Sequence, residues 1–383
     1  EMKVYNFERD TFEKGKVEKF IQNRHTLAAA TMSFPNKLAA AEKFKDTMQK
    51  RHPGIKKRKI FVSKRELHNA QQKIRPLLYQ LFLDKADTYP IISYIKDKNY
   101  QEELKRDCVD MDLEISFDIK KYYDNISSEM IQKSLRKMGF SFAASKMITK
   151  LCTVRMGNKF TLQQGSSVSP LISNIVGYYY LDAPIQGYLD ELRKKYPRMK
   201  IVYKRFCDNI GIWIDGPIPA GISESIKEEV KKRVRPFLVH DWKTVSQEHP
   251  YLAQTFLGMV LNKKPKVDNY NYNKTRSILF NAATKTLYHQ ALYYFKEKGD
   301  DLYHQNENPR AVVDKFLEKL GGYVNYVKQI NPTQGRRLDK LYRYCTSRKN
   351  SYVNIPATDE EFRRIKRYVD DSESVYEFLT QFT

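Results

Sequence analysis

The sequence predicts an α+β protein, in which an antiparallel sheet with its helices is followed by a separate helical domain. Three observations predict this class. Apolar and polar residues alternate at 111–118 and within 201–215, apolar residues recur at helical spacing before and between these stretches, and beyond about residue 282 the chain turns helical and basic. No repeat or low-complexity tract appears, and 41% of the 383 residues are hydrophobic, which is enough for more than one core.

The N-terminal part is expected to be helical. Residues 1–55 mix charged and scattered apolar positions, and the basic run at 56–59 follows them. Ser63 to Glu66 then has the S-x-x-E pattern of a capping box, after which apolar residues recur at helical spacing as far as Leu81. Pro76 is expected to kink or end that helix.

The centre of the chain is predicted to hold the strands. The alternation at 111–118 indicates a half-buried strand with carboxylates on its other face, and 128–157 has a helical pattern. Ser169 and Pro170 offer an N-cap followed by proline, which predicts a helix through about residue 181. Further predicted elements are a hairpin at 201–215 turning at Asp208-Asn209, a helix at 223–234 and a second hairpin at 255–262.

The net charge predicts a polyanionic partner. Lys and Arg number 68 against 45 Asp and Glu, which leaves +23, far more than solubility requires. The 27 Tyr and 20 Phe supply stacking faces beside groups that neutralise phosphates. Nucleic acid is therefore the expected partner.

Two other classes of protein are not expected. No stretch of ~18 apolar residues occurs and the start lacks a signal peptide's apolar core, so we expect a soluble intracellular protein with no membrane partner. Four cysteines are scattered without CxxC spacing, which indicates thiols rather than a zinc site or a disulfide framework.

Short motifs in the centre carry the chemistry. SFDIKKYYDNI places Asp118 at the end of the first strand, LQQGSSVSPLISN follows about forty residues on, and FCDN lies in the hairpin turn. In this order they resemble motifs A, B and C of the reverse transcriptase palm. VHDWKT resembles motif D, TFLGMVLNKK the primer-grip hairpin, KKRKIFVSKRELHNAQQKI the bacterial fingers segment, and LGGYVNYVKQINP the thumb. The matches cover about 56–332.

The resemblance implies a right-hand polymerase, with fingers and palm built from an antiparallel sheet plus helices and with an α-helical thumb. The implied domains are an N-terminal helical extension at 1–55, fingers at 56–110, a palm at 111–265 that includes part of the fingers at 128–160, a thumb at 266–350 and a C-terminal helical tail at 351–383.

A metal site is predicted at the strand ends. Extending a nucleic acid requires a 3′ hydroxyl to attack an α-phosphate, which two divalent ions assist, and Mg²⁺ takes oxygen ligands. Asp118 and Asp208 are the expected ligands of two Mg²⁺ ions, for which Mn²⁺ can substitute, and the resemblance adds the backbone carbonyl of Ile119. Alone, Asp118 also fits a solvated strand-end carboxylate, and Asp208-Asn209 an ordinary turn.

Asn209 departs from the family pattern. Reverse transcriptases keep two aspartates at this turn, whereas Asn209 offers a carbonyl oxygen without a charge and should hold a metal less tightly. Polymerases of non-segmented negative-strand RNA viruses also use Asp-Asn here. The implied catalytic set is Asp118, Asp208, Asn209 and Lys243, of which Lys243 matches the motif D lysine that would give a proton to pyrophosphate.

Three further residues match contacts to the incoming nucleotide. Tyr123 stands where the family keeps an aromatic that clashes with a 2′-OH, which implies deoxynucleotides, although a core aromatic beside Tyr122 fits the spacing equally well. Gln164 and Gly165 match the nucleotide-contacting pair, and the glycine lets the backbone approach the nascent base pair. Gln163 replaces the usual proline.

The fingers and the primer grip complete the implied site. Lys57 and Arg58 stand where the family clamps the triphosphate, although a charge run also fits a solvated face. Phe256, Leu257 and Gly258 would hold the primer end, and a buried hairpin accounts equally for the first two. Further basic residues of the fingers and thumb are expected to line the duplex: Lys64, Arg65, Lys73, Arg75, Arg336, Arg337, Lys340, Arg343, Arg348 and Lys349.

The lineage follows by subtraction. Neither the retron signatures NAxxH and VTG nor an RNase H or endonuclease segment is found, so the chain most resembles the defence-associated, abortive-infection type within the group II intron and retron-like bacterial lineage. This implies a cytoplasmic RNA-directed DNA polymerase acting in antiphage defence on dNTPs. The implied partners are an RNA template or non-coding RNA, the DNA product, and a second reverse transcriptase or further copies of the chain. Alternatives are untemplated, protein-primed or protein-templated synthesis, or a catalytically weakened RNA-binding scaffold.

Overall fold

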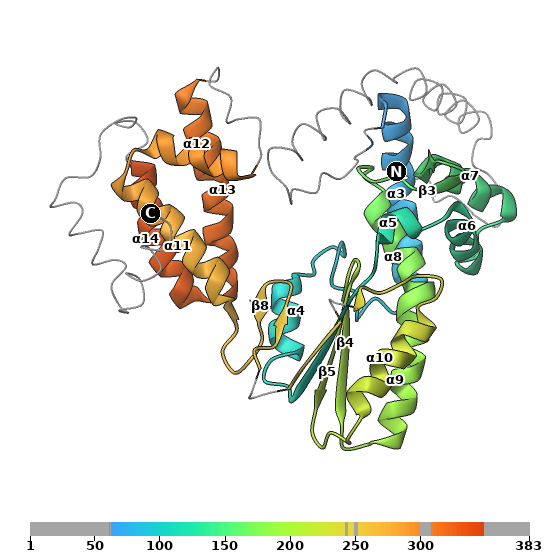
Figure 1. Ribbon diagram of the computed structural model, residues 1–383. Helices are drawn as coiled ribbons and strands as arrows, with labels where there is room; N and C mark the ends of the chain where they lie inside the picture. Colours follow the sequence, from blue (N-terminus) through green and yellow to red (C-terminus); the bar gives the residue numbers. More distant parts are fainter. Residues whose placement is uncertain (1–60, 62, 242–243, 249–251, 299–307, 348–383) are drawn as a thin grey trace. The chain divides into compact units, whose positions relative to one another are not determined.

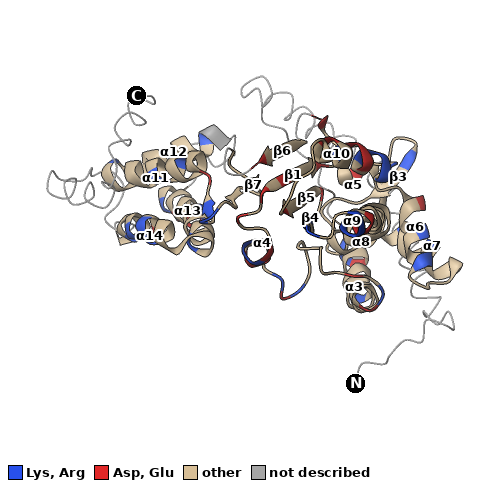
Figure 2. Ribbon diagram, turned by 90° about the horizontal axis from the view of Figure 1, so that it is seen from below, with Lys and Arg blue, Asp and Glu red and all other residues tan. Residues whose placement is uncertain are grey.

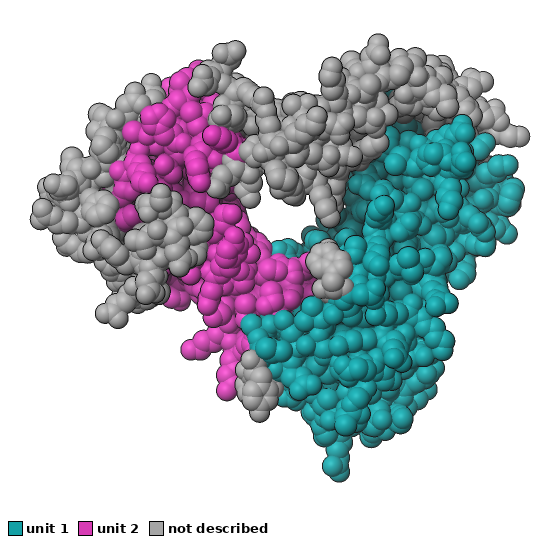
Figure 3. Space-filling view, viewed as in Figure 1, with its two compact units in different colours: residues 1–43, 57–254 teal, residues 44–56, 255–383 magenta. Residues whose placement is uncertain are grey.

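The computed structural model describes residues 61, 63–241, 244–248, 252–298 and 308–347. The chain divides into two compact units, which Figure 3 colours separately, and the division falls between Gln254 and Thr255. The predicted N-terminal extension, the basic run at 56–59 and the C-terminal tail lie outside the described residues.

The first unit is built on a four-stranded antiparallel sheet. Its order is β4 (Lys200–Phe206), β5 (Asn209–Asp215), β1 (Leu113–Asp118) and β6 (Val245–Glu248). The alternation in the sequence correctly predicts β1 and the β4–β5 hairpin, because each of these strands has one face in the core. Strands β5 and β1, which are far apart in the sequence, thus lie side by side in the middle of one sheet.

Helices cover both faces of this sheet. On the core face lie α8 (Ser169–Gly177), a π-helical turn (Tyr178–Asp182), α9 (Ala183–Lys195) and α10 (Ile222–Arg233) (Figure 1). The opposite face carries α4 (Tyr100–Asp107), whose Asp107 Oδ2 lies 2.6 Å from the buried Lys204 Nζ of β4. Asp118 and Glu114 point to the α4 face, because they alternate with the core residues of β1.

The remaining elements of the first unit are α3 (Arg65–Lys85), α5 (Tyr122–Asn125), α6 (Ser128–Lys137), α7 (Phe142–Cys152) and the hairpin β2 (Thr153–Met156) and β3 (Lys159–Leu162). Residues 153–156 are therefore a strand, not the end of a helix as predicted. Helix α3 continues past Pro76. The predicted capping box does not form, because the Ser63 hydroxyl donates to Gln71 Oε1.

Two predicted boundaries near the motifs are wrong by one residue. The β4–β5 turn consists of Cys207 and Asp208, and Asn209 already pairs with Phe206 as the first residue of β5. Turn propensity favoured Asp208-Asn209, but the pairing of the strands sets the register. Ser169 is the first helical residue rather than the N-cap, and its hydroxyl donates to the Gln163 carbonyl.

In its described residues, the second unit joins a small sheet to four helices. Its strands are β7 (Thr255–Phe256), β8 (Met259–Val260) and β9 (Lys266–Val267), and its helices are α11 (Asn269–Thr284), α12 (Leu287–Lys298), α13 (Pro309–Ile330) and α14 (Pro332–Ser347). Helical structure thus begins at 269, earlier than the predicted 282. The small sheet belongs with these helices, since Tyr326 donates to the Leu257 carbonyl at 3.1 Å and Asn331 to that of Pro265 at 3.2 Å.

Basic side chains predicted to contact nucleic acid lie on the surface of α3 and α14. Figure 2 shows Lys and Arg in blue, and the described basic residues of α3 and α14 named above are exposed. All four cysteines are buried and none is in a disulfide. Within the described ranges, no helix combines the length and the apolar character needed to cross a membrane.

Glu114 is a buried carboxyl in the middle of the sheet. Its side chain is 1% exposed and pairs across the strands with Trp213 and Gln247. Burial raises the pKa of this carboxyl to about 8. The folded protein therefore holds this proton more tightly than the unfolded chain, so its contribution to stability is complete below the ordinary pKa and is lost as the pH rises toward 8.

Replacing Glu114 by Gln is expected to remove this pH dependence. At pH 5, the free energy of unfolding of Glu114→Gln should differ little from that of the original chain. At pH 8 it should be higher by roughly 2–4 kcal/mol, which is a difference that the raised pKa of Glu114 can account for. Urea unfolding across that pH range measures the difference. Glu248→Gln, on the exposed part of β6, is the control and should show a flat difference. A flat difference for Glu114→Gln would show that its carboxyl titrates normally.

Candidate active site

The sheet brings the predicted metal ligands together. Asp118 is the last residue of β1 and stands opposite Asn209, the first of β5. The Ile119 amide donates to the Asp208 carbonyl at 2.9 Å, so the chain directly after β1 lies against the turn that carries Asp208. Asp118, Ile119, Asp208 and Asn209 thus meet at one end of two neighbouring strands, as the motif order predicts.

The turn that presents Asp208 has an unusual backbone. Cys207 has a φ of +56°, in the left-handed region that residues other than glycine rarely adopt. Its amide donates to Ser93 Oγ at 3.0 Å, and its carbonyl accepts from Arg205 Nη1 at 3.0 Å. Such a conformation persists where the surroundings hold it, and these two contacts do so on either side of Cys207.

A buried ion pair lies behind this turn. The guanidinium of Arg205 donates to Asp182 Oδ1 at 2.7 Å and to Oδ2 at 2.8 Å, and both side chains are almost fully buried. Tyr203 donates to the same Oδ1 at 2.6 Å. Burial alone would lower the pKa of Arg205, but the charge of Asp182 outweighs it and the pKa is raised. A Cβ on Gly177 would lie 2.8 Å from the guanidinium, so glycine is required there.

Sequence reasoning did not identify this pair. Arg205 directly precedes the FCDN motif, and Asp182 follows the motif B helix in the π-helical turn. The signal was an arginine in a strand whose neighbours on the same face, Tyr203 and Ile201, are buried. Arg205 and Asp182 position the turn rather than taking part in the site itself.

A side-chain nitrogen lies close to each of the two carboxylates, Asp118 and Asp208. His240 Nε2 lies 3.6 Å from Asp118 Oδ1, and the His240 amide donates to the Asp118 carbonyl at 2.8 Å. Asn209 Nδ2 donates to Asp208 Oδ1 at 3.2 Å. Burial, followed by the charge of Asp208, raises the pKa of the Cys207 thiol to about 11. His240 was not predicted, although it lies within the motif D segment.

The donor chemistry fits a divalent ion bound together with its substrate. Asp118, Asp208 and the Ile119 carbonyl supply hard oxygen donors, which suit Mg²⁺. In the described part of the chain, no group of three or more His, Cys, Asp or Glu side chains is placed to hold a metal. Mg²⁺ is commonly held by one or two carboxylates with substrate phosphates and water, so two aspartates suffice when a nucleotide is present.

The residues that match nucleotide contacts lie on α5 and in the loop before α8. Tyr123 is on α5, where the Ser173 hydroxyl donates to its oxygen at 3.4 Å, and burial raises its pKa. Gln164 donates at 2.8 Å to Asp124, the residue that directly follows Tyr123. Gly165 has a φ of +98°, which explains the glycine. Motif B and the α5 helix are therefore tied together.

Gln163 makes side-chain contacts that the usual proline could not make. Its buried amide donates to the Phe61 carbonyl at 3.1 Å and to Ser63 Oγ at 3.0 Å, and the Phe61 amide donates to the Gln164 carbonyl at 2.8 Å. A proline at this position would lack that side-chain amide. Gln163 thus connects the motif B loop to the segment that follows the basic run.

The other predicted residues fall into two groups. Lys57, Arg58 and Lys243 lie outside the described residues. Phe256, Leu257 and Gly258 belong to the second unit, where Leu257 and Gly258 form a turn with φ of +51° and +78°. Phe256 is buried.

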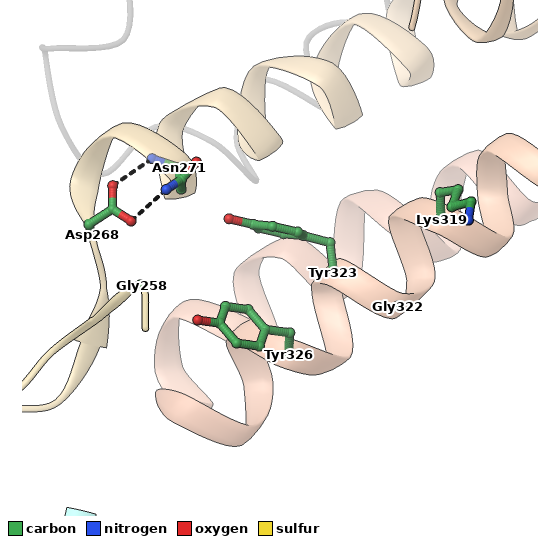
Figure 4. Close-up of a pocket in the computed structure, with 7 residues that line it drawn as sticks. All are labelled: Gly258, Asp268, Asn271, Lys319, Gly322, Tyr323 and Tyr326. Atoms are coloured by element: carbon green, nitrogen blue, oxygen red, sulfur yellow. Dashed lines mark hydrogen bonds between the residues drawn. The ribbon is translucent and has the colours of Figure 1, made fainter. Parts of the chain in front are cut away.

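A pocket of the second unit lies beside this turn. It has a volume of about 420 Å³, and Figure 4 shows the side chains of Tyr323 and Tyr326 pointing from α13 toward Gly258 and the start of α11. A Cβ on Gly258 would lie 3.1 Å from the Tyr326 hydroxyl. The pocket is lined by Gly258, Asp268, Asn271, Lys319, Gly322, Tyr323 and Tyr326.

No protein-family model matches the chain, and no curated protein matches it. Among solved structures it is similar to telomerase from Candida albicans in complex with a TWJ fragment of telomeric RNA, with 12% identity and a TM-score of 0.39 over 79% of this chain and 58% of that chain. It is also similar to telomerase from Candida tropicalis with such a fragment, with 13% identity and a TM-score of 0.37 over 92% and 60%. The chain thus spans less than two thirds of either telomerase, and a likeness at this level carries no functional assignment.

Proposed function

We propose that this chain is an RNA-directed DNA polymerase, a nucleotidyltransferase that adds dNTPs to a 3′ end. The observation that supports it most is the meeting of Asp118 and Asp208 at the ends of β1 and the β4–β5 turn. The order of seven motifs along the chain supports it independently. Fingers, palm and thumb are the proposed names for the helices around the sheet, the sheet itself and the helices of the second unit.

The proposed reaction forms a bond between the 3′ oxygen and the α-phosphorus, breaks the bond to the β-phosphate, and releases pyrophosphate. Asp118, Asp208 and the Ile119 carbonyl would hold Mg²⁺ or Mn²⁺, which when bound lower the pKa of the attacking hydroxyl and stabilise the leaving oxygens. Lys243 would give the proton that pyrophosphate takes up.

The other proposed residues bind and orient the substrates. Lys57 and Arg58 would contact the triphosphate, and Gln164 and Gly165 the nascent base pair. Tyr123 would exclude a ribose 2′-OH. The primer end would be held by Phe256, Leu257 and Gly258.

The biological setting is proposed on the motif resemblance alone. The chain would act in the bacterial cytoplasm in antiphage defence, together with an RNA and either a second reverse transcriptase or further copies of itself. Alternatively, the same site would carry out untemplated, protein-primed or protein-templated synthesis. A net charge of +23 favours nucleic acid as the partner in each case.

One observation favours a second candidate, an RNA-binding scaffold with a weakened site. Directly after the turn, an amide replaces the second carboxylate, and Asn209 donates to Asp208 instead of adding charge for a metal. The scaffold would bind RNA through the same basic surface and make no product.

Incorporation of labelled nucleotides tests the proposal. The protein and its co-purified RNA are incubated with labelled dNTPs and Mg²⁺ or Mn²⁺, and the product is sequenced. We expect DNA that copies RNA. A product unrelated to any nucleic acid would indicate untemplated synthesis, and RNA binding without a product would favour the scaffold.

Replacing Asn209 by Asp tests the role of the turn amide. We expect Asn209→Asp to keep or raise incorporation, because a third carboxylate opposite Asp118 strengthens the hold on a divalent ion. In EDTA the same carboxylate should lower the melting temperature, since like charges then face each other without an ion. Primer extension and thermal unfolding with and without Mg²⁺ measure both effects. If the melting temperature of Asn209→Asp is the same with and without Mg²⁺, this would count against a metal at this turn.

A further inference from the structure

The segment 238–240 pairs with the chain at the end of β1. It is joined there by an antiparallel bridge to Ile119 and by the His240 amide, which donates to the Asp118 carbonyl at 2.8 Å. His240 therefore stands opposite Asp118 on one side of β1, as Asn209 does on the other side. Residues directly opposite each other in an antiparallel pair have their side chains on the same face. Asn209, Asp118 and His240 thus form a row across this end of the sheet.

The His240 imidazole lies where a second ligand of an ion at Asp118 would lie. Its Nε2 is 3.6 Å from Asp118 Oδ1, which is too long for a hydrogen bond. Neighbouring ligands of an octahedral ion with bonds of about 2.1 Å lie about 3 Å apart, so a small rotation of either side chain brings both atoms onto one ion. The His240 side chain is 26% exposed and that of Asp118 is 18% exposed, so an ion can reach both from solvent.

The carboxylate next to His240 is paired with lysines. Asp241 lies 2.7 Å from Lys231 Nζ and 3.9 Å from Lys120 Nζ. Both ammonium groups compete with a metal ion for the oxygens of Asp241. His240 rather than Asp241 is therefore the candidate ligand from this segment.

We propose that His240 is a further ligand of the metal ion at Asp118, and that its nitrogen makes the site select Mn²⁺ over Mg²⁺. The inference deepens the proposed function, on which it rests for the metal-binding role of Asp118. Mg²⁺ is a hard ion that binds oxygen, whereas imidazole nitrogen is a ligand of transition-metal ions. Mn²⁺ accepts both kinds of donor, so the carboxylate and the imidazole together give Mn²⁺ a bond that Mg²⁺ uses poorly.

Electron paramagnetic resonance of bound Mn²⁺ tests the inference without relying on catalysis. The full chain is given Mn²⁺ and inorganic pyrophosphate, which stands in for the substrate phosphates and contains no nitrogen. We expect spin-echo modulation from a directly bound imidazole nitrogen, and this modulation should change to the ¹⁵N pattern when the histidines are labelled with ¹⁵N.

His240→Gln should lose this modulation, because glutamine offers an oxygen in place of the imidazole nitrogen. It should also bind Mn²⁺ about tenfold or more weakly, which is the scale of effect that residues around a metal site have on affinity. The affinity for Mg²⁺, measured by displacement of Mn²⁺, should change little. His289→Gln is the matched control and should keep both the modulation and the affinity, because His289 is an exposed histidine of the second unit that contacts Thr286 at 2.7 Å.

The outcomes separate this inference from the proposed function. If Asp118→Ala weakens Mn²⁺ binding but no histidine nitrogen modulates the signal, or if His240→Gln keeps the modulation, the inference is overturned and the polymerase assignment stands. Equal weakening of Mg²⁺ and Mn²⁺ binding in His240→Gln would overturn the selectivity. The ¹⁵N-labelled original protein decides whether histidine binds the ion even if His240→Gln folds poorly.

Two further outcomes concern the site as a whole. If Asp118→Ala binds Mn²⁺ as tightly as the original protein, the metal-site assignment and the inference both fail. If the modulation depends on His240 but the protein incorporates no dNTP with either ion, the inference stands and the polymerase assignment fails.

Discussion

Replacing Asp118 or Asp208 by Ala is expected to lower nucleotide incorporation by a factor of about 10³ or more. Each carboxylate is a proposed ligand of the ions that stabilise the transition state, and a metal supplies several kcal/mol of such stabilisation. Because the two residues act on the same ions, the double variant should be little worse than either single one. Primer extension with labelled dNTPs measures all three variants.

The controls must separate chemistry from folding. Asp215→Ala removes a carboxylate from the opposite end of β5 and should leave incorporation unchanged. Asp118→Ala should also keep its RNA binding, since the basic surface is untouched, and this distinguishes a lost reaction from a lost protein. Full incorporation by either Asp118→Ala or Asp208→Ala would refute the metal-site assignment.

Sequence periodicity identified the sheet for a physical reason. The apolar core residues of β1 and β5 lie on one face of the sheet, so apolar residues recur at every second position, and Asp118 could be placed at a strand end. The turn was wrong by one residue because local propensity and strand pairing disagree there. Pairing decides, since Phe206 and Asn209 complete the ladder and leave Cys207 in the left-handed region.

The pairing of the residues that support the site had no local signal in the sequence. Asp182 and Arg205 are 23 positions apart, and their pairing exists only once α9 packs on β4. The same holds for Ser93, which is 114 positions from Cys207. Motifs are read along the chain, whereas these contacts join segments that only the fold brings together. The hairpin predicted at 255–262 was likewise recognisable, but its packing on α13 was not.

The buried pair of Arg205 and Asp182 should be the most sensitive structural feature of the first unit. We expect Arg205→Met or Asp182→Asn to lower the free energy of unfolding by about 3–5 kcal/mol, because each leaves an unmatched polar or charged group in the core. Urea unfolding measures the loss. Lys133→Met, which removes an exposed partner of Glu129, is the control and should unfold close to the original protein.

The double variant Arg205→Met/Asp182→Leu decides whether the pair stabilises the fold or positions the turn. Replacing both partners by apolar groups removes the unmatched charge, so the double variant should be more stable than the sum of the single losses implies. Incorporation should nevertheless stay low, because methionine does not donate to the Cys207 carbonyl that Arg205 Nη1 holds at 3.0 Å. Arg205→Lys keeps the charge but loses the bidentate contact. Its free energy of unfolding and its incorporation should therefore lie between those of Arg205→Met and the original protein. A double variant that regains both stability and incorporation would show that the turn holds its strained conformation without Arg205.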